Sequence, residues 1–383
     1  MDGQGYARNW RREMKIAIDC RMSGKSGIGT FLDNIIPFFA SSGNSILFLG
    51  LPKKKQDELE QQASSESKKL SFLPCDIKNF SIKEMLAFPS CLLKEINSCD
   101  VYFSPYCNIP GRIFSRGIKI PVYTTIHDVI FLDMKEIAGR VGTFVRKMIY
   151  KRAVRLSKGI FTVSLFSKDR IIENLACKKK ITVVYNGVPL YNEENSSVSP
   201  TEKTNTVLFV GNIKKHKGLA TLIPAFVKFR DELSLSEEEK PKLIVVGSRE
   251  NFRTEDRELG RQLSFAEKNG IIFTGFIPDK KLKELLSSAK VLVQPSLYEG
   301  FGIPPLQALY SGTKVVISDI PVFKEIYADL PVCFFKAGSI EDLAQKLNSV
   351  YLSKDALGEV KKIYSYRNTA EKILNTIIED FRG

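Results

Sequence analysis

The sequence predicts an α/β fold composed of two doubly wound parallel-sheet domains. The chain has 383 residues, which is too many for one ordinary hydrophobic core and suits two domains. Short apolar runs rich in β-branched residues alternate with segments of helical periodicity. A polar stretch without periodicity divides these runs into two series, so each series is predicted to form its own sheet.

The predicted strands contain few polar residues, as expected of parallel strands that are covered on both faces. Those of the first series are Lys15–Cys20, Ser45–Leu49, Val101–Phe103, Val122–Thr125, Ile160–Val163 and Ile181–Val184. Those of the second series are Val207–Val210, Leu243–Val246, Ile271–Thr274, Val291–Gln294, Val315–Ser318 and Val332–Phe334. Their alternation with helices is typical of Rossmann-like domains.

The domain boundaries follow from the polar stretch Pro189–Thr206, in which residues 191–206 are predicted to be the linker. An N-terminal domain would then comprise residues 1–190 and a C-terminal domain residues 207–365. Because ligands bind beyond the carboxyl ends of parallel strands, two such domains facing each other would place a site in the cleft between them.

Residues 366–383 are predicted to form a terminal amphipathic helix. Apolar residues recur there at helical spacing, namely Ala370, Ile373, Leu374 and Ile377. This helix could pack back on the N-terminal domain.

The formal charge of +14 results from 57 basic and 43 acidic side chains. Such a surplus attracts polyanions, so nucleic acid, an anionic membrane face and a phosphorylated ligand are all candidate partners. A nucleic-acid-binding protein would interleave basic residues with exposed aromatic residues on one face. The basic residues here are scattered outside one segment, so the sequence favours no nucleic-acid partner.

The seven cysteines include no C-x-x-C pair, and only two histidines are present. Reduced thiols in the cytoplasm are therefore expected instead of a zinc site or a disulfide framework. The polar residues Met1–Glu13 are not followed by the apolar region of a signal peptide, and no apolar run approaches the length that spans a membrane. We expect a cytoplasmic protein, with the inner face of the cytoplasmic membrane as the alternative location.

The most informative stretch is Ser296–Gln307 (SLYEGFGIPPLQ), which follows the predicted strand Val291–Gln294. Gly300 and Gly302 allow a ligand close to the backbone, and the prolines suit the start of a helix. The free N–H groups and dipole of a helix N-terminus attract phosphate. An ordinary turn between a strand and a helix would have a similar pattern, so this stretch alone does not decide the function.

The segment resembles the E-x7-E signature of family 4 of the retaining GT-B glycosyltransferases. Further segments are similar to that family in the same order along the chain, and together they span most of it. They are Ser26–Phe31 (SGIGTF), Ile126–Val129 (IHDV), Thr162–Lys168 (TVSLFSK), Val184–Val188 (VYNGV) and Val210–Gly218 (VGNIKKHKG). The resemblance implies two domains of GT-B type with the donor in the cleft.

The resemblance also implies roles for individual residues. Glu299 matches the first glutamate of the signature, which contacts the donor sugar, and Gln307 replaces the second, which holds the ribose. Lys217 matches the phosphate-binding lysine, while Asn212 stands where the family often has an arginine. A lysine beside the leaving diphosphate would stabilise its growing charge.

His127 matches a histidine that contacts the donor sugar, and a neutral imidazole can donate and accept a hydrogen bond. The catalytic residues expected from the resemblance are thus Glu299, His127 and Lys217. The donor-binding residues expected are Gly27, Gly29, Asn212, Lys217, Glu299, Gly300, Phe301, Gly302, Ile303 and Gln307. No Asp-x-Asp cluster is present, so neither a metal nor another cofactor is expected.

A basic segment, Arg140–Lys158, interleaves Arg and Lys with apolar residues. It could rest on an anionic membrane surface, or it could be a solvated helix that packs its apolar side on the first domain.

The expected activity is transfer of a hexose, mannose or a related sugar, from a nucleotide-sugar donor with retention at the anomeric carbon. The resemblance favours GDP-mannose first and a UDP-sugar second, with a glycan or lipid-linked glycan as acceptor in cell-surface polysaccharide synthesis. A nucleotide-sugar 2-epimerase of GT-B fold and a basic nucleic-acid-binding protein are the alternatives. A phosphorylase would need a pyridoxal-phosphate lysine, which the sequence does not identify.

Overall fold

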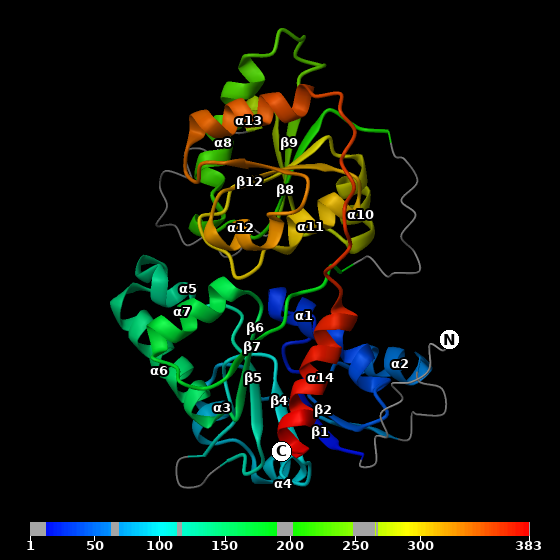
Figure 1. The fold of residues 1–383 in the computed structure, drawn as a ribbon, viewed down its shortest axis with the longest axis vertical. Coiled ribbons are helices and arrows are strands. Elements are labelled where there is room, and N and C mark those ends of the chain that lie inside the picture. Colours follow the sequence, from blue (N-terminus) through cyan, green and yellow to red (C-terminus); the bar gives the residue numbers. More distant parts are fainter. Residues whose placement is uncertain are drawn as a thin grey trace, which may run out of the picture. The chain divides into compact units, whose positions relative to one another are not determined.

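The computed structural model describes residues 13–62, 69–112, 117–189, 202–247, 265 and 267–382. They divide into two compact units (Figure 1). Unit 1 comprises the described residues of Met1–Val163, Ser167–Tyr185 and Tyr366–Gly383, and unit 2 those of Ser164–Phe166 and Asn186–Ser365. The chain passes from the first unit to the second at Tyr185–Asn186, and most of the predicted linker 191–206 lies outside the described residues.

Unit 1 contains a parallel sheet of seven strands in the order β3-β2-β1-β4-β5-β6-β7. Its strands are β1 (Lys15–Asp19), β2 (Ser45–Leu49), β3 (Leu70–Leu73), β4 (Val101–Ser104), β5 (Val122–Thr125), β6 (Gly159–Thr162) and β7 (Ile181–Val183). The sequence analysis missed β3, which lies at the edge of the sheet. It is partly exposed, and Ser71 interrupts its apolar residues, so it lacks the buried apolar run by which the other strands are recognised.

Unit 2 contains a parallel sheet of six strands in the order β10-β9-β8-β11-β12-β13. Its strands are β8 (Thr206–Val210), β9 (Lys242–Val246), β10 (Ile271–Gly275), β11 (Val291–Gln294), β12 (Lys314–Ser318) and β13 (Val332–Phe335). This is the 3-2-1-4-5-6 order of a doubly wound sheet, in which ligands bind outside the carboxyl ends where the strand order reverses. The predicted α/β fold class with two doubly wound domains is confirmed.

Helices connect the parallel strands, because a parallel pair cannot be joined by a tight turn. Those that begin before β8, together with the last helix, are α1 (Ser26–Ala40), α2 (Lys53–Gln62), α3 (Ile82–Leu86), α4 (Ser90–Ile96), α5 (Ile130–Asp133), η2 (Lys135–Ile137), α6 (Gly139–Leu156), α7 (Leu165–Leu175) and α14 (Tyr366–Arg382). The others are η4 (Lys215–Lys217), α8 (Leu219–Asp231), η5 (Glu267–Asn269), α10 (Asp279–Ser288), α11 (Ile303–Tyr310), α12 (Pro321–Tyr327) and α13 (Ile340–Leu352).

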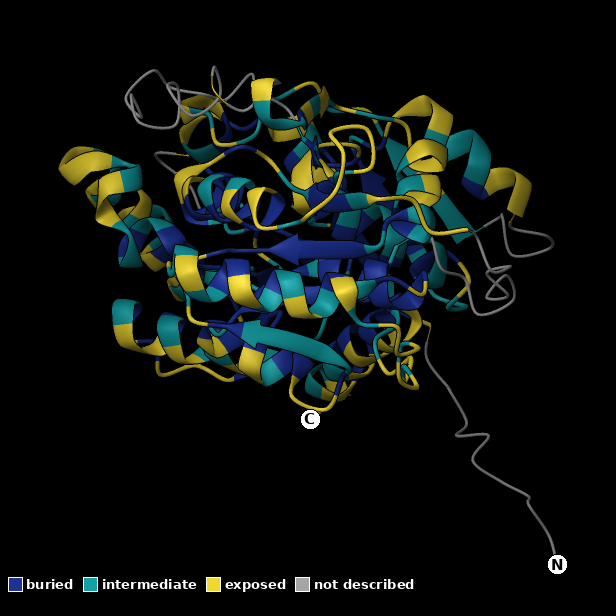
Figure 2. Cartoon of the chain, turned by 90° about the horizontal axis from the view of Figure 1, so that it is seen from above, coloured by how far each residue is buried: buried dark blue, intermediate teal, exposed yellow. Residues whose placement is uncertain are grey.

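The strands form the buried interior and most helices expose one face, as Figure 2 shows. In unit 2, α8 and α13 pack together, and α13 also contacts β11, β12 and β13. Apolar side chains of both helices and of the strands form one buried cluster. Fully burying one such large apolar side chain contributes about 1.5–3 kcal/mol.

The last helix, α14, belongs to unit 1 although the residues just before it belong to unit 2. The apolar face read from the sequence is buried, and it packs against α1 in the same core cluster as β1 and β2. The two ends of the chain therefore build one core.

Candidate functional site

The predicted donor-binding segment of unit 2 follows β11 and leads into α11. Gly302 is the N-cap of this helix, and Pro304 lies in its first turn. Gly302 has φ 89°, and a Cβ atom at this position would lie 2.3 Å from Cε1 of Phe323. The Tyr327 hydroxyl donates a hydrogen bond to the Gly302 carbonyl. Two side chains of α12 thus hold the glycine in a left-handed conformation that favours this residue.

Lys217 and Glu299 form an ion pair, although 82 positions separate them in the sequence. The Lys217 ammonium lies 2.7 Å from Glu299 Oε1 and 2.8 Å from Oε2. Their side chains are only 21% and 10% exposed, so the pair is largely shielded from water. The structure therefore brings together the two charged residues that the sequence analysis assigned to donor phosphate and donor sugar.

The position of Lys217 depends on a close approach between two loops. Gly218, which ends η4, has φ 73°, and a Cβ atom there would lie 1.8 Å from the Pro295 carbonyl oxygen. The Leu297 amide donates a hydrogen bond of 2.7 Å to the His216 carbonyl. Only a glycine fits at Gly218, which explains why the loop after β8 can lie against the loop after β11.

Two residues to which the sequence analysis gave no role continue the hydrogen bonds from Glu299 to the end of β11. Ser296 Oγ lies 2.8 Å from Glu299 Oε1, and Gln294 Nε2 donates a 3.0 Å hydrogen bond to Ser296 Oγ. Both side chains are fully buried at the end of β11. The sequence did contain a signal for these two residues, because both are polar and stand at the end of a strand predicted to be buried. A buried polar group requires a hydrogen-bond partner.

The other predicted donor-binding residues of unit 2 differ in exposure. Gln307 is buried on α11, with Nε2 3.5 Å from the Pro189 carbonyl oxygen. The Phe301 ring is also buried and packs edge-on against Tyr364, so only its backbone is suited to a ligand. Gly300 and Ile303 are partly exposed, and Asn212 is exposed in the loop after β8.

Three predicted site residues belong to unit 1: Gly27, Gly29 and His127. Gly27 lies in the first turn of α1 and is open, since a Cβ atom there would meet nothing within 4 Å. Gly29 is buried, and a Cβ atom there would lie 2.5 Å from the Met22 carbonyl oxygen. Gly29 therefore lets α1 pack on its own preceding loop, whereas the surface at Gly27 is accessible.

His127 follows β5, and its ring lies edge-on to Phe31 of α1 with centroids 4.9 Å apart. His127 Nε2 lies 2.9 Å from the Pro105 carbonyl oxygen, which can only accept a hydrogen bond. Burial lowers the pKa of His127 to about 4. The neutral ring thus carries its proton on Nε2, and Nδ1 is left as a hydrogen-bond acceptor.

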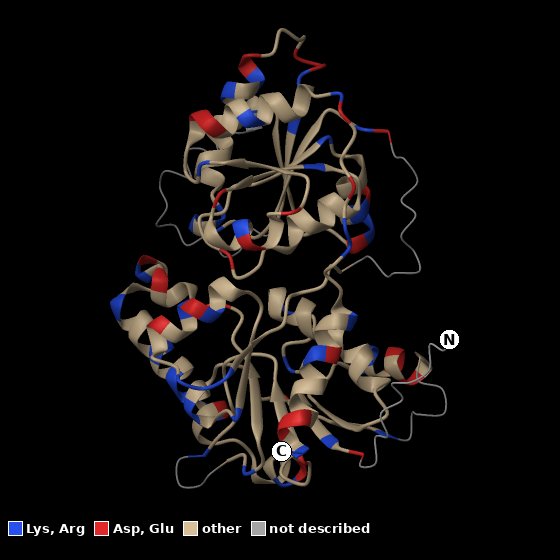
Figure 3. Ribbon diagram, in the orientation of Figure 1, with Lys and Arg blue, Asp and Glu red and all other residues tan. Residues whose placement is uncertain are grey.

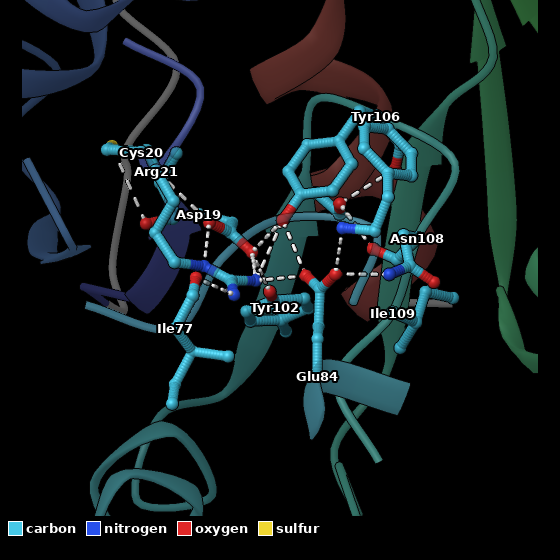
Figure 4. Close-up of polar contacts among 12 residues, drawn as sticks. Asp19, Cys20, Arg21, Ile77, Glu84, Tyr102, Tyr106, Asn108 and Ile109 are labelled. Carbon is cyan, nitrogen blue, oxygen red and sulfur yellow. Dashed lines mark hydrogen bonds and ion pairs between the residues drawn. The ribbon is translucent and has the colours of Figure 1, made fainter. Parts of the chain in front are cut away.

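Beside the β1–α1 loop lies a buried polar network that the sequence analysis missed (Figure 4). Arg21 donates from Nε to Asp19 and from Nη2 to Glu84 and to the Tyr106 hydroxyl. The charge and hydrogen bonds of Arg21 lower the pKa of Asp19 against the opposing effect of burial, while burial raises the pKa of Glu84. Nothing in the sequence pairs Glu84 with Arg21.

A pocket of about 570 Å³ adjoins this network beyond the ends of β1, β2 and β3. It is lined by Arg21, Lys25, Gly50, Asp76, Lys78 and Asn79, among others. Arg21 Nη1 also donates a 3.2 Å hydrogen bond to the Ile77 carbonyl. The network therefore fixes the two segments that enclose the pocket.

In each unit, the fold and the candidate residues define a doubly wound α/β domain with polar groups beyond the carboxyl ends of its strands. Comparison with family models assigns both domains. Residues 25–191 match the family described as "Glycosyltransferase Family 4", and residues 192–368 match "Glycosyl transferases group 1". The chain therefore consists of two glycosyltransferase-family domains in succession.

The relatives found among curated proteins include two that are described as O-antigen chain mannosyltransferases. The O-antigen chain mannosyltransferase RfbU of Salmonella typhimurium is 33% identical over 222 residues, which cover 55% of this chain and 59% of the relative. The matched part of this chain spans between 56% and 60% of the length of the first curated relatives.

Solved structures share the fold at low sequence identity. The sucrose-phosphate synthase of Thermosynechococcus elongatus gives a TM-score of 0.68 at 15% identity, covering 97% of this chain and 100% of the other. HepE of Anabaena, solved in complex with UDP and glucose, gives a TM-score of 0.67 at 16% identity, covering 96% and 100%.

Proposed function

We propose that this chain is a retaining glycosyltransferase that moves a hexose from a nucleotide-sugar donor to a glycan or lipid-linked glycan acceptor. The observation on which the proposal depends is the Lys217–Glu299 pair, which lies in the same unit as the N-terminus of α11. The match of both domains to glycosyltransferase families supports it.

The pair offers a cation to the diphosphate of a donor and a carboxylate to its sugar. The ammonium of Lys217 has three N–H groups, and two of them face the oxygens of Glu299. The third is proposed to bind the diphosphate, together with the backbone amides of Gly302 and Ile303 at the start of α11, because the two prolines that follow have no N–H group. The remaining lone pairs of the Glu299 carboxylate are proposed to accept hydrogen bonds from sugar hydroxyls, and Gln307 is proposed to bind the ribose.

In the proposed step, the bond from the anomeric carbon to the diphosphate oxygen breaks and a bond to an acceptor hydroxyl oxygen forms. The acceptor proton passes to the departing phosphate. Lys217 and the amides of Gly302 and Ile303 stabilise the negative charge that develops on the diphosphate. His127 contributes Nδ1 as an acceptor to a sugar hydroxyl, and no metal or other cofactor is assigned a role.

For the donor, we propose GDP-mannose first, because the relative RfbU is described as a mannosyltransferase. A UDP-sugar is the second candidate, because the HepE structure contains UDP and glucose. The acceptor side is assigned to unit 1, in whose pocket Lys25 and Asp76 offer polar groups to a glycan. The proposed setting is polysaccharide or lipopolysaccharide synthesis in the cytoplasm, at the inner face of the membrane.

A first experiment identifies the nucleotide. A thermal-shift panel of GDP, UDP, ADP and TDP and their sugar conjugates is expected to show stabilisation by one base, with GDP compounds first. Saturation at a hundred times Kd would contribute about 2.7 kcal/mol of stability. Stabilisation by none of these compounds would contradict the proposed function. Incubation with donor alone, followed by NMR, would reveal an epimerase instead.

A second experiment tests the pair. We expect Lys217→Ala to weaken binding of the nucleoside diphosphate by about tenfold or more, because it removes a charge-assisted hydrogen bond. Glu299→Gln should leave diphosphate affinity within a few fold and reduce transfer by about 100-fold or more. Calorimetry and a product assay separate these two outcomes, with the exposed Lys280→Ala as control. If the Glu299→Gln variant transferred sugar as fast as the wild-type enzyme, the role proposed for this carboxylate would be wrong.

A further inference from the structure

The 18-residue helix α6 of unit 1 presents an uncovered apolar stripe. The four side chains that form it stand at positions i, i+3, i+4 and i+7, so they lie on one face of the helix. They are Val141, Phe144, Val145 and Met148, which are 78%, 65%, 49% and 53% exposed. We name these four residues the α6 stripe.

The helix is also strongly basic. It contains no Asp or Glu, while Arg140, Lys147 and Lys151 follow one another at helical spacing along one flank of the α6 stripe. Arg155 continues this basic character in the last turn. Figure 3 shows the Lys and Arg residues along this helix.

Other basic residues of α6 are already engaged within unit 1. Arg152 donates a 2.6 Å hydrogen bond to the Ile109 carbonyl, and the Arg146 guanidinium lies 3.6 Å from the ring centroid of Phe131. Tyr150 and Ala153 are buried and attach the helix to its domain. The α6 stripe is thus held on a fixed helix, because the opposite face is packed.

A second group of exposed apolar side chains belongs to the same unit, on and just before α3. It comprises Phe80, Ile82 and Leu86, which are 43%, 73% and 42% exposed. The segment lies near the second half of α6, since Gly111 approaches both Arg152 and the Met85 backbone. Exposed apolar residues near a basic face mark an interaction surface more often than scattered single residues do.

We propose that α6 docks unit 1 on an anionic lipid surface. The α6 stripe enters the boundary between headgroups and acyl chains, and Arg140, Lys147, Lys151 and Arg155 contact lipid phosphates. Charge complementarity selects this partner, because a helix without any carboxylate matches an anionic surface and repels a basic one. The proposal does not require sugar transfer, but it would bring a lipid-linked acceptor to the enzyme.

No helix among the described residues has the length and apolar character needed to cross a membrane. Docking through α6 is therefore proposed as contact with the surface alone.

The test is co-sedimentation of the full chain with vesicles of two compositions. One is phosphatidylcholine alone, and the other is an equimolar mixture of phosphatidylcholine and phosphatidylglycerol. We expect binding to the anionic vesicles that high salt weakens, and little binding to the neutral ones. Equal binding to both, or binding to neither, would overturn the proposal.

Paired variants separate local docking from overall charge. Lys147→Gln with Lys151→Gln should lower partitioning about 30-fold, because each basic residue near an anionic surface adds a favourable interaction. Lys280→Gln with Lys361→Gln removes the same charge at exposed positions of unit 2 and should change partitioning only a few fold. Equal losses in the two pairs would mean that net charge alone attracts the vesicles, and the proposal would fail.

The α6 stripe is tested in the same way. Phe144→Ser with Met148→Ser should lower partitioning about tenfold or more. The matched control is Phe276→Ser with Leu352→Ser, two exposed side chains of unit 2.

Sedimentation velocity tests the alternative that a second copy of the chain covers the α6 stripe. The proposal would be overturned if the wild-type chain self-associated without binding vesicles and the stripe variant did not self-associate. Nucleotide binding in each variant reports separately on the donor site.

Discussion

The candidate donor site consists of individual residues whose charges compensate each other. Glu299 is largely buried and accepts from both Lys217 and Ser296. Burying a charged carboxylate without such partners would cost free energy. Lys217 therefore stabilises the charge of Glu299 in the absence of a ligand. The two charged side chains are therefore held in place before any ligand binds.

The two histidines predict how stability depends on pH. Burial lowers the pKa of His127 to about 4, and burial together with the charge of Lys217 does the same for His216. Between pH 6.5 and 4 the unfolded chain binds more protons than the folded chain at these sites. Stability is therefore complete above pH 6.5 and is lost as pH falls towards 4.

We expect His127→Gln to reduce the loss of unfolding free energy between pH 7 and pH 5. The upper limit of the effect is about 2 kcal/mol. Urea denaturation at both pH values measures it, and His216→Gln provides the matched variant at the other site. An unchanged pH dependence in both variants would show that neither histidine is held neutral.

The elements that shape the site are short segments between strands and helices. The N-terminus of α11 is fixed by α12, through the contact of Phe323 with Gly302 and the hydrogen bond from Tyr327. The loop after β8 is fixed by Gly218 against Pro295. In both places a glycine allows the backbone of one element to lie against another.

Substitution of Gly302 tests this arrangement. Gly302→Ala should lower the unfolding free energy of unit 2 by about 2 kcal/mol or more, because it adds a steric clash to the strain of a left-handed residue. Gly312→Ala is the control, since Gly312 has φ 73° but open space around a Cβ atom. It should cost only about 1 kcal/mol. Similar costs in denaturant titrations of the two variants would show that Phe323 adapts to the added methyl group.

The molecule as a whole is built from two units with separate apolar cores. The final helix α14 completes the core of unit 1 through residues such as Ile373 and Ile377, both fully buried. The core of unit 1 therefore combines residues that precede unit 2 in the sequence with residues that follow it.

This dependence on the chain end can be measured. Ile373→Ala should destabilise unit 1 by about 2–5 kcal/mol, because it leaves a cavity in the core. Ile363→Ala, at an exposed position before α14, should change stability by less than about 0.5 kcal/mol. Hydrogen exchange of amides in β1 and β8 reports on the two units separately. Equal loss of protection in both strands would show that the units unfold together.

The sequence by itself determined the strands, the terminal helix and the residues at strand ends. Buried parallel strands require unbroken apolar runs, and these are visible in the sequence, as in Val122–Thr125 and Val291–Gln294. The edge strand β3 was the exception, because it is partly exposed and Ser71 interrupts its apolar residues.

Only the tertiary structure decided which polar groups pair. Lys217 with Glu299, Arg21 with Glu84, and His127 with the Pro105 carbonyl each join distant segments. Their geometry depends on how loops pack beyond a sheet edge, which residue spacing does not encode. The exposure of the α6 stripe likewise became known only when the packed face of that helix was seen. Periodicity identifies an apolar face, and packing decides whether the protein covers it.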